Sequence, residues 1–420
     1  MKLKWIIIPI LLLAELGLCA AIVAVSWGGI ARIQTTGVRW PLRMFQLNTV
    51  SAEADEEQHF TVDGSATLNV ENSNGKITVT GGAGDTIDIS AHKTAWGANQ
   101  ADADEALATL KVTATQKGNV FTIQVEQPPE VHLMDGGPSD SVELTIRVPS
   151  ETAVNAHTDF GEVKLSGTDG DADLQSSAGA IHATDVNSGT LSLHSEFGEI
   201  TIERSVGESI EADTSSGGVK LTDVSAEGEV NLSSNFGDIQ FEDGQAGTLW
   251  VETDSGGVKL TDLTVNDELT AKTDFGTITL LRVMADAYDL HSSAGSISLD
   301  NPNGSVKADT DFGDVEVTNG KNISQLDLQS SNGAIKFSGS LGDGPHLLET
   351  DFGSIRLTLP QDTALTFDLK TDFGKIRSEF PMTINGDPDE DKQHGTINGG
   401  GVSLTAKTSS GNITLEILNP

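Results

Sequence analysis

Acidic side chains recur directly before a phenylalanine and a glycine over much of the chain. The carboxylates in this position are Asp159, Glu196, Asp274, Asp311, Asp351 and Asp372, and Asn235 is the one exception. Carboxylate oxygens are ligands that Ca²⁺ prefers in proteins. Calcium binding is therefore the first chemistry to weigh for this row of residues.

Catalysis finds no support in the other polar residues. The single cysteine, Cys19, lies in an apolar N-terminal run, which excludes intrachain disulfides and cysteine-ligated zinc. His157, His194 and His291 are far apart in the chain, and no Ser/His/Asp motif accompanies them. The likeness of Asp-Phe-Gly to a kinase motif is accidental, because the glycine-rich loop, lysine strand and catalytic loop of kinases are missing. We predict that the protein is not an enzyme and has no catalytic residues.

The charge balance excludes nucleic acid as a partner. The chain of 420 residues has 25 Lys and Arg against 62 Asp and Glu, which gives a formal net charge of −37. Such a surface repels phosphates. The hydrophobic fraction is only 37%, but the apolar residues are regularly placed, which indicates a folded chain and not a disordered one.

A repeat of about 19 residues must position these groups. In every copy a glycine is preceded, three places earlier, by Ser or Thr and is followed, two places later, by Ile or Val. The glycines are Gly161, Gly179, Gly198, Gly217, Gly237, Gly256, Gly276, Gly295, Gly313, Gly333, Gly353, Gly374 and Gly411. Apolar, polar and hydroxyl residues alternate before each glycine, which is the period of a half-buried strand. Each copy therefore predicts a strand, a glycine corner, a second strand and a second corner.

Copies this short cannot bury a core alone, but stacked copies can. The predicted fold class is all-β: a parallel β-solenoid (β-helix) of about 14 coils with a roughly 19-residue repeat, preceded by one N-terminal transmembrane helix. We expect the Ile and Val residues to form an interior column and the hydroxyls a hydrogen-bonded ladder at the corner. Antiparallel hairpins are the alternative, which the lack of regular Asn-Gly or Asp-Gly turns disfavours.

A phenylalanine precedes the glycine on every second coil until Phe373, which breaks the alternation in the sequence. Stacked coils lie about 4.8 Å apart, so carboxylates on alternate coils are about 9–10 Å apart, too far for one Ca²⁺ to bridge. We therefore predict no cofactor and no metal, with calcium as the alternative. Each ring either covers the small residue of the next coil or belongs to an exposed edge. The candidate binding edge consists of Asp159, Phe160, Phe197, Phe236, Asp274, Phe275, Asp311, Phe312, Asp351, Phe352, Asp372 and Phe373.

The first residues predict a membrane anchor. Lys2 and Lys4 precede an apolar run from Trp5 to Trp27 that contains one charge, Glu15. A helix of this length can cross a hydrocarbon core of about 30 Å, and the run is too long for a typical signal-peptide core, although a cleaved signal peptide remains the alternative. The predicted segments are a cytoplasmic tail (1–4), a transmembrane signal-anchor (5–27) and a juxtamembrane linker (28–58).

The ends of a solenoid need cover, because exposed strand edges invite polymerisation. Residues 59–150 are less regular and predict the first coils together with a cap. Residues 151–420 predict the regular solenoid. The elements expected near the two ends are a helix at Ala101–Leu110, strands at Phe121–Glu126 and Val142–Pro149, a loop at Pro381–Gly401 and a last coil at Val402–Leu418.

The layout resembles a bacterial family known as putative adhesins, built of β-strand-repeat domains of unknown function. The matching features are the opening Phe60-Thr-Val-Asp-Gly, the segment Leu68-Asn-Val-Glu-Asn-Ser-Asn-Gly-Lys-Ile-Thr-Val79, the helix-bearing insertion, the strand Val142–Pro149 and the repeats, over roughly 59–420. The resemblance implies a membrane-tethered protein of the cell envelope and supplies no catalytic residues.

These observations together predict a membrane-anchored, extracytoplasmic solenoid with adhesin-like binding or scaffolding work in the bacterial cell envelope. The predicted location is the cell membrane, crossed once, with the bulk of the chain outside the cytoplasm. The predicted partners are the cytoplasmic membrane, through residues 5–27, and a cell-surface glycan or envelope protein. The alternative is an envelope-stress or signalling component that acts through membrane-protein partners.

Overall fold

A computed structural model describes residues 50–420 except 83, 128–137, 387–388 and 419–420, and these residues belong to one compact unit. The predicted tail (1–4), anchor (5–27) and most of the linker (28–58) lie outside the described residues. Strand β1 begins at Val50, so strand structure reaches into the segment predicted as a linker. Within the described part of the chain, no helix is both long and apolar enough to cross a bilayer.

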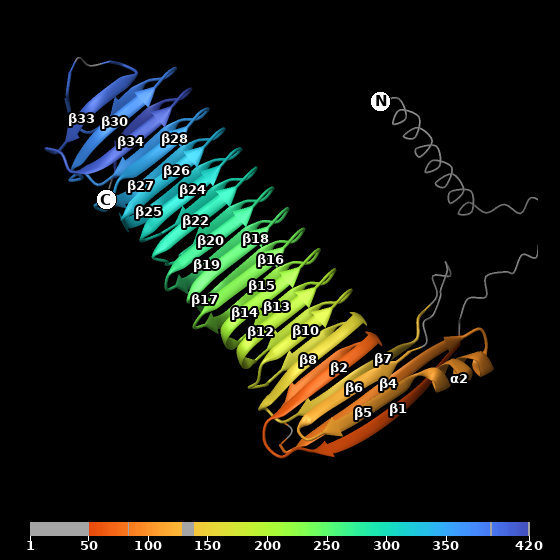
Figure 1. Ribbon diagram of the computed structural model, residues 1–420. Helices are drawn as coiled ribbons and strands as arrows, with labels where there is room; N and C mark the ends of the chain where they lie inside the picture. Colours follow the sequence, from red (N-terminus) through yellow and green to blue (C-terminus); the bar gives the residue numbers. More distant parts are fainter. Residues whose placement is uncertain (1–49, 83, 128–137, 387–388, 419–420) are drawn as a thin grey trace, which may run out of the picture. The chain divides into compact units, whose positions relative to one another are not determined.

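Two ladders of parallel strands form the two faces of a solenoid (Figure 1). The first ladder contains β2 (Ala66–Asn74), β8 (Thr152–Phe160), β10 (Ala172–Ser176), β12 (Asn187–Ser195), β14 (Val206–Thr214), β16 (Glu229–Ser234), β18 (Thr248–Thr253), β20 (Glu268–Thr273), β22 (Ala287–Ser292), β24 (Ser305–Thr310), β26 (Gln325–Ser330) and β28 (His346–Thr350). The second contains β3 (Ile77–Gly81), β9 (Val163–Ser166), β11 (Ile181–Thr184), β13 (Ile200–Glu203), β15 (Val219–Ala226), β17 (Ile239–Ala246), β19 (Val258–Val265), β21 (Ile278–Leu281), β23 (Ile297–Asp300), β25 (Val315–Ile323), β27 (Ile335–Leu341) and β29 (Ile355–Leu359).

The core is a set of apolar columns between the two ladders. Val258, Ile278 and Ile297 are paired in register in consecutive coils and are at most 1% exposed. Leu232, Val251 and Ala271 form a matching column in the first ladder. The period-two pattern of the sequence thus turns one side of each strand inward. The chain is an all-β parallel β-solenoid, as predicted, with about ten regular turns from β8–β9 to β26–β27.

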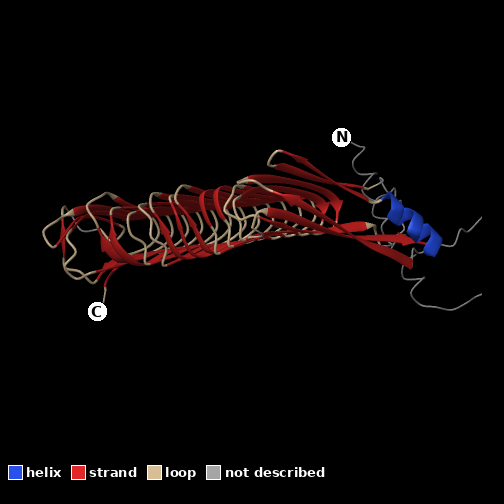
Figure 2. Ribbon diagram, turned by 90° about the horizontal axis from the view of Figure 1, so that it is seen from below, coloured by secondary structure: helices blue, strands red, loops and turns tan. Residues whose placement is uncertain are grey.

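The N-terminal end is covered by strands that reverse the direction of pairing. β6 (Val120–Glu126) and β7 (Ser141–Val148) pair in parallel with β2 and β3, in the place of an earlier coil. β5 (Lys111–Lys117) then pairs antiparallel with β6, β4 (Thr86–Gly97) antiparallel with β7, and β1 (Val50–Thr61) antiparallel with β4. The helix α2 (Gln100–Thr109) follows β4 and lies beside this end (Figure 2). The predicted helix is present.

The C-terminal end departs from sequence order. β34 (Val402–Thr408) pairs in parallel with β28 on one side and with β30 (Leu365–Thr371) on the other. β35 (Ile413–Ile417) likewise lies between β29 and β31 (Ile376–Ser378). The segment predicted as the last coil, Val402–Leu418, is therefore inserted between two earlier coils, because pairing partners are set by space and not by order in the chain.

Two further strands cover this end. The segment predicted as a loop, Pro381–Gly401, contains β32 (Met382–Ile384) and β33 (Lys392–Ile397). β33 pairs antiparallel with β30 and with β32, so it covers the outer edge of the first ladder. In the described part of the chain, antiparallel strands thus cover both ladders at the N-terminal end and the first ladder at the C-terminal end, which is one way in which proteins protect sheet edges.

Candidate functional site

The glycine corner, defined by the thirteen glycines of the repeat, is fixed by close stacking. A Cβ atom built on Gly256 would lie well inside 3.0 Å of the carbonyl oxygen of Gly237 in the neighbouring coil. Gly411 meets Gly353 in the same way, and Gly374 meets Gly411. Backbone atoms cannot yield as a flexible side chain can, so glycine is required here by distance.

The hydroxyl column holds the same corner by hydrogen bonds. Thr253 Oγ1 donates to the carbonyl oxygen of Gly237 (3.0 Å) and accepts from the backbone N–H of Gly256 (3.1 Å). Every Ser or Thr in the column donates to a glycine carbonyl of the adjacent coil, from Thr158 to Gly75 (3.3 Å) through to Thr408 to Gly353 (2.8 Å). These hydroxyls are buried, and the predicted hydrogen-bonded ladder is confirmed, with glycine carbonyls as the acceptors.

The phenylalanines beside these glycines point into solvent. Their side chains are 62% to 82% exposed, and they are Phe160, Phe197, Phe236, Phe275, Phe312, Phe352 and Phe373. The only ring–ring contact between aromatic side chains of the described residues lies elsewhere, between Phe60 and Phe121 at 5.8 Å. The small residues on the coils between are exposed too, so the rings do not cover them as a packed column would. The rings are therefore exposed, and their role as a binding edge stays a prediction.

The inserted C-terminal coil restores the alternation that Phe373 breaks in the sequence. The backbone N–H of Ser410 donates to Asp351 O (2.8 Å), and the N–H of Phe373 donates to Ser409 O (3.0 Å). Phe352, Ser410 and Phe373 therefore lie on successive coils. In space every second coil carries a phenylalanine, and the coils between carry exposed small or polar residues, which are Ala178, Ser216, Ser255, Ala294, Asn332 and Ser410.

The carboxylates before these phenylalanines lie on the same corner, and several have no charged partner. Asp159 contacts His157 (3.3 Å), and Asp372 contacts Lys370 (3.0 Å), which raises the pKa of that lysine. Glu196, Asp311 and Asp351 form no ion pair with any described residue. Asp274 accepts a long hydrogen bond from Ser293 (3.4 Å) and likewise has no cationic partner among those residues.

Further carboxylates follow the glycine on four of the phenylalanine coils, and the sequence interpretation did not single them out. They are Glu162, Glu199, Asp238 and Asp314. In the sequence these carboxylates alternate with small or neutral residues on the intervening coils, and this alternation could have identified them. Glu162 alone is enclosed by cations, since Lys164 (2.8 Å) and Lys76 (2.9 Å) both contact it. Every ring therefore has an acidic residue on at least one side in the chain, and Phe160, Phe197 and Phe312 have one on both sides.

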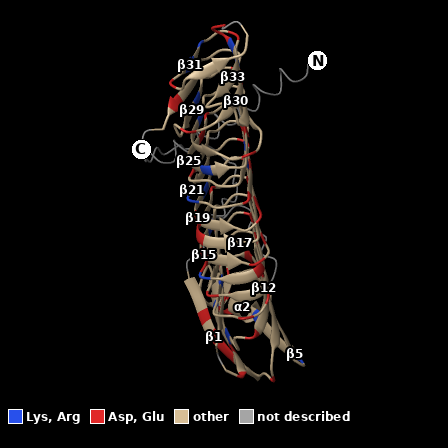
Figure 3. Cartoon of the chain, turned by 90° about the vertical axis from the view of Figure 1, so that its left-hand side faces the viewer, with Lys and Arg blue, Asp and Glu red and all other residues tan. Residues whose placement is uncertain are grey.

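Metal binding gains no support from the described residues. Nowhere in that part of the chain are three or more His, Cys, Asp or Glu side chains grouped to hold an ion. The histidines of one column are paired singly with carboxylates, such as His194 with Asp213 (2.8 Å). Asp and Glu are distributed along the length of the solenoid and outnumber Lys and Arg (Figure 3).

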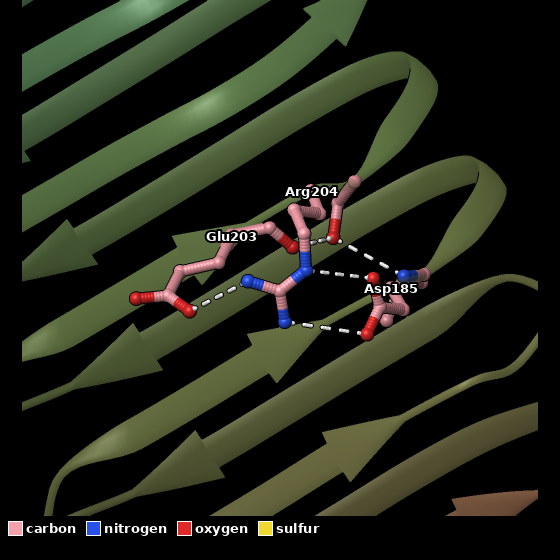
Figure 4. A network of polar contacts seen from close by, with 5 residues as sticks. Asp185, Glu203 and Arg204 are labelled. Carbon is pink, nitrogen blue, oxygen red and sulfur yellow. Dashed lines mark hydrogen bonds and ion pairs between the residues drawn. The ribbon is translucent and has the colours of Figure 1, made fainter.

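The second corner is built differently and carries a separate polar network. Eight non-glycine residues there have left-handed φ angles of 47° to 64°, and they are Asp185, Arg204, Asp223, Asp243, Asp262, Arg282, Asn301 and Asn319. We call this column the left-handed corner. Arg204 donates to both carboxylate oxygens of Asp185 (2.9 and 3.3 Å) and to Glu203 (3.3 Å), as Figure 4 shows. The Asp185 carboxylate raises the pKa of Arg204.

The repeats decide the family. The Toastrack DUF4097 family matches residues 65–261 and 233–416, which together cover most of the described solenoid. The chain belongs to this family. The resemblance inferred from Leu68–Val79, Val142–Pro149 and the repeats is confirmed. No curated protein matches the Toastrack chain significantly.

Solved structures similar to this Toastrack chain are distant. A putative cell adhesion protein from Clostridium sporogenes ATCC 15579 is 11% identical with a TM-score of 0.17, covering 87% of this chain and 100% of that one. A putative adhesin from Bacteroides fragilis NCTC 9343 is 12% identical (TM-score 0.26; 86% and 97% covered). A putative lipid binding protein from Parabacteroides distasonis ATCC 8503 is 9% identical (TM-score 0.23; 86% and 96% covered). Likeness at this level supports no conclusion about binding or activity.

Proposed function

We propose that this Toastrack protein is a non-enzymatic binding or scaffolding module of the bacterial cell envelope, whose contact surface is the phenylalanine edge. The phenylalanine edge comprises the seven exposed phenylalanines and the carboxylates that precede them (Asp159, Glu196, Asp274, Asp311, Asp351 and Asp372). The solenoid, with its roughly ten regular turns, is held at the extracytoplasmic side by the apolar residues 5–27. The partner is a cell-surface glycan or an envelope protein.

The observation that carries this proposal is the exposure of a periodic row of rings. Half of the 14 phenylalanines of the chain occupy this one corner, each at least 62% exposed. Burial of a phenylalanine side chain is worth about 1.5–3 kcal/mol, so the fold gives up that stabilisation repeatedly. Extended apolar rows of this kind on a soluble surface mark sites of interaction.

The rest of the described surface favours binding over catalysis. A hollow of about 410 Å³ lies on the sheet of β1, β4 and β7 and is lined by polar residues that include Glu57, His59, Asp88 and Arg147. His59 and Asp88 form an exposed ion pair (2.8 Å) there. No nucleophile is activated in this hollow by a buried base, and the regular coils contain no local break that would create a catalytic cluster.

The test is retention of cell-envelope material by the full-length protein. Phe236, Phe275 and Phe312 are changed together to alanine, and Val206→Ala/Met284→Ala serves as the control, because these two apolar side chains are exposed (49% and 50%) away from the edge. We expect the triple variant to retain at least about tenfold less envelope polymer or envelope protein, with an unchanged melting temperature. The control should behave as the parent protein does.

Two results would count against the proposal. Equal retention by the triple variant would remove the edge as the contact. Cross-linking in cells that recovers a fixed set of membrane signalling proteins, independent of the edge, would support the envelope-stress or signalling alternative instead.

A further inference from the structure

The spacing of the rings sets a length that a partner must match. Successive phenylalanines are two coils apart, and coils stack about 4.7–4.9 Å apart, so the rings repeat at about 9.4–9.8 Å. The register is continuous from Phe160 to Phe373, because the inserted coil places Ser410 between Phe352 and Phe373. A linear partner that lies along this edge needs the same repeat.

The positions between the rings leave room for such a partner. Ala178, Ser216, Ser255, Ala294 and Ser410 are exposed and have short side chains, and Asn332 is the longest residue in this set. The rings do not contact one another, so a gap lies between each pair of rings. The edge is therefore a row of alternating rings and gaps that is open to solvent along its length.

The charge of the edge selects a cationic partner. Glu196, Asp274, Asp311 and Asp351 stand beside four of the rings, and none of them is ion-paired with a described residue. Glu199, Asp238 and Asp314 add negative charge on the other side of the same corner. A second copy of this chain would bring like charges together at every ring, since its net charge is −37. A basic chain would gain from each carboxylate and from cation–π contact with the rings.

We propose that the phenylalanine edge binds a basic, proline-rich polypeptide segment in the polyproline II conformation, laid along the rod. This inference rests on the proposed function and names the partner class. A polyproline II helix has three residues per turn and a rise of about 3.1 Å, so each side chain recurs on one face every ~9.3 Å. That repeat differs from the ring spacing by only a few tenths of an ångström. Prolines at two of the three positions pack against rings and gaps, and Lys or Arg at the third faces the carboxylates.

The polyproline II conformation also explains why an open edge suffices. Its backbone has no internal hydrogen bonds and stays solvated, so the edge need not supply strand pairing. Aromatic side chains line the usual receptors for such helices. The ligand is already ordered before it binds, so binding costs little conformational entropy. The edge offers this surface on the glycine corner, where the backbone hydrogen bonds are already used between coils.

The experiment measures binding of a labelled (Lys-Pro-Pro)₆ peptide to the full-length protein in mild detergent by fluorescence anisotropy. At about 3.1 Å per residue this peptide is about 56 Å long and spans most of the edge. The control peptide (Lys-Lys-Pro-Pro-Pro-Pro)₃ has the same composition but spreads its lysines over two faces. We expect the first peptide to bind at least about tenfold more tightly, with an affinity that falls as salt rises.

Two sets of variants test the rings and the charges separately. Phe236→Ala/Phe275→Ala/Phe312→Ala should weaken binding at least about tenfold, and Val206→Ala/Met284→Ala should leave it within about twofold. Asp274→Asn/Asp311→Asn/Asp351→Asn should weaken binding and flatten its salt dependence. Ser216→Phe/Ser255→Phe fills two gaps and halves the ring spacing, which should remove the preference for the three-residue repeat.

Several outcomes would overturn the inference. Equal binding of the two peptides, or equal binding by the triple phenylalanine variant, removes the match of repeats. Preferential binding of a β-linked N-acetylglucosamine oligomer would make the partner a glycan, and edge-dependent dimers in sedimentation velocity would make it a second copy. If the peptide fails to bind while envelope material is still retained through the edge, this inference falls and the proposed function stands.

Discussion

The glycine corner and the left-handed corner both bend the chain within a coil, yet by different physical means. At the glycine corner a Cβ atom would overlap with the carbonyl oxygen of the next coil. At the left-handed corner the backbone has φ angles of 47° to 64°, and Asp, Asn and even Arg adopt them. The short distance between coils leaves no room for any side chain at the glycine corner. The left-handed φ angle at the other corner costs most residues only about 1–2 kcal/mol.

This difference explains where each corner can carry function. At the glycine corner close stacking fixes the glycine and hydrogen bonds fix the hydroxyl, so the residue before the glycine is held in register from coil to coil. That rigid register is what a periodic row of rings requires. The left-handed corner varies in length and residue type, and its side chains make local ion pairs such as Arg282 with Asp262.

The sharpest test of the comparison is an alanine substitution at each corner. Gly256→Ala places a Cβ against the backbone of Gly237, and we expect it to cost about 3 kcal/mol or more, because neither backbone can move without breaking the stack. Asp243→Ala at the left-handed corner should cost no more than about 1 kcal/mol. Urea denaturation of the two full-length variants measures both. Similar midpoints would show that close stacking does not govern the glycine corner.

A matched pair of threonines tests the hydrogen bonds. Thr253→Val removes the donor to Gly237 and the acceptor of Gly256, and leaves two buried backbone groups unpaired, which should cost about 1–3 kcal/mol. Thr261 lies next to the left-handed corner, and its buried hydroxyl has no hydrogen-bond partner among the described residues. Thr261→Val should therefore be neutral or stabilising. An equal loss for the two changes would contradict the role given to the hydroxyl ladder.

A pH titration tests a buried histidine at the start of a first-ladder strand, away from both corners. His346 begins β28 beside Leu326 and Leu404, is 2% exposed, and makes one hydrogen bond, to Gly342 O (3.2 Å). Burial lowers the pKa of His346 below its ordinary value of 6.5. The unfolded chain then binds the proton more readily, so this residue makes stability fall as the pH drops below about 6.5.

The measurement is the difference between the parent protein and His346→Leu in urea midpoints from pH 7.5 down to pH 5. The leucine variant should lose less stability over this range, since it matches the apolar column and cannot be protonated. Parallel pH profiles of the two proteins would rule out the buried histidine as a source of acid sensitivity.

The smallest expected effect is a change to glycine at the left-handed corner. Asp243→Gly removes the strain of a φ of 54°, which stabilises the folded chain. Glycine also raises the conformational entropy of the unfolded chain, which lowers the free energy of unfolding by a similar amount. The net change should lie within about 0.5 kcal/mol. A loss near the Gly256→Ala value would show that Asp243 has a structural role that its backbone angle does not reveal.

The sequence predicts the parts of this fold that depend on local periodicity. The columns of Thr253, Gly256 and Val258 repeat in every coil, so strand, corner and interior could be assigned from their spacing. The left-handed corner could not, because Arg204 or Asp243 in that conformation has no distinctive neighbour in the sequence. The exposure of the rings was open as well, since a phenylalanine beside a small residue fits a packed corner and an open edge equally well.

The order of the coils at the C-terminal end was beyond prediction for another reason. A repeat shows that each copy can pair with any other copy, and the sequence does not state which copies become neighbours. Gly374 and Gly411 fit the same template, so the natural assumption was that they follow one another along the rod. The hydrogen bonds of Ser410 and Phe373 show instead that the later copy lies inside the earlier one.

That inserted coil makes the order of assembly differ from the order of synthesis. A ribosome releases residues 365–378 before residues 402–417, yet the earlier segment pairs with the later one and with β33, and not with β28 or β29. This end of the rod therefore cannot reach its final pairing before β34 and β35 have been synthesised. A chain that lacks β34 and β35 would keep most of its coils and still display a pairing-competent edge at β28 and β29, so this fold makes truncation visible as an open strand edge.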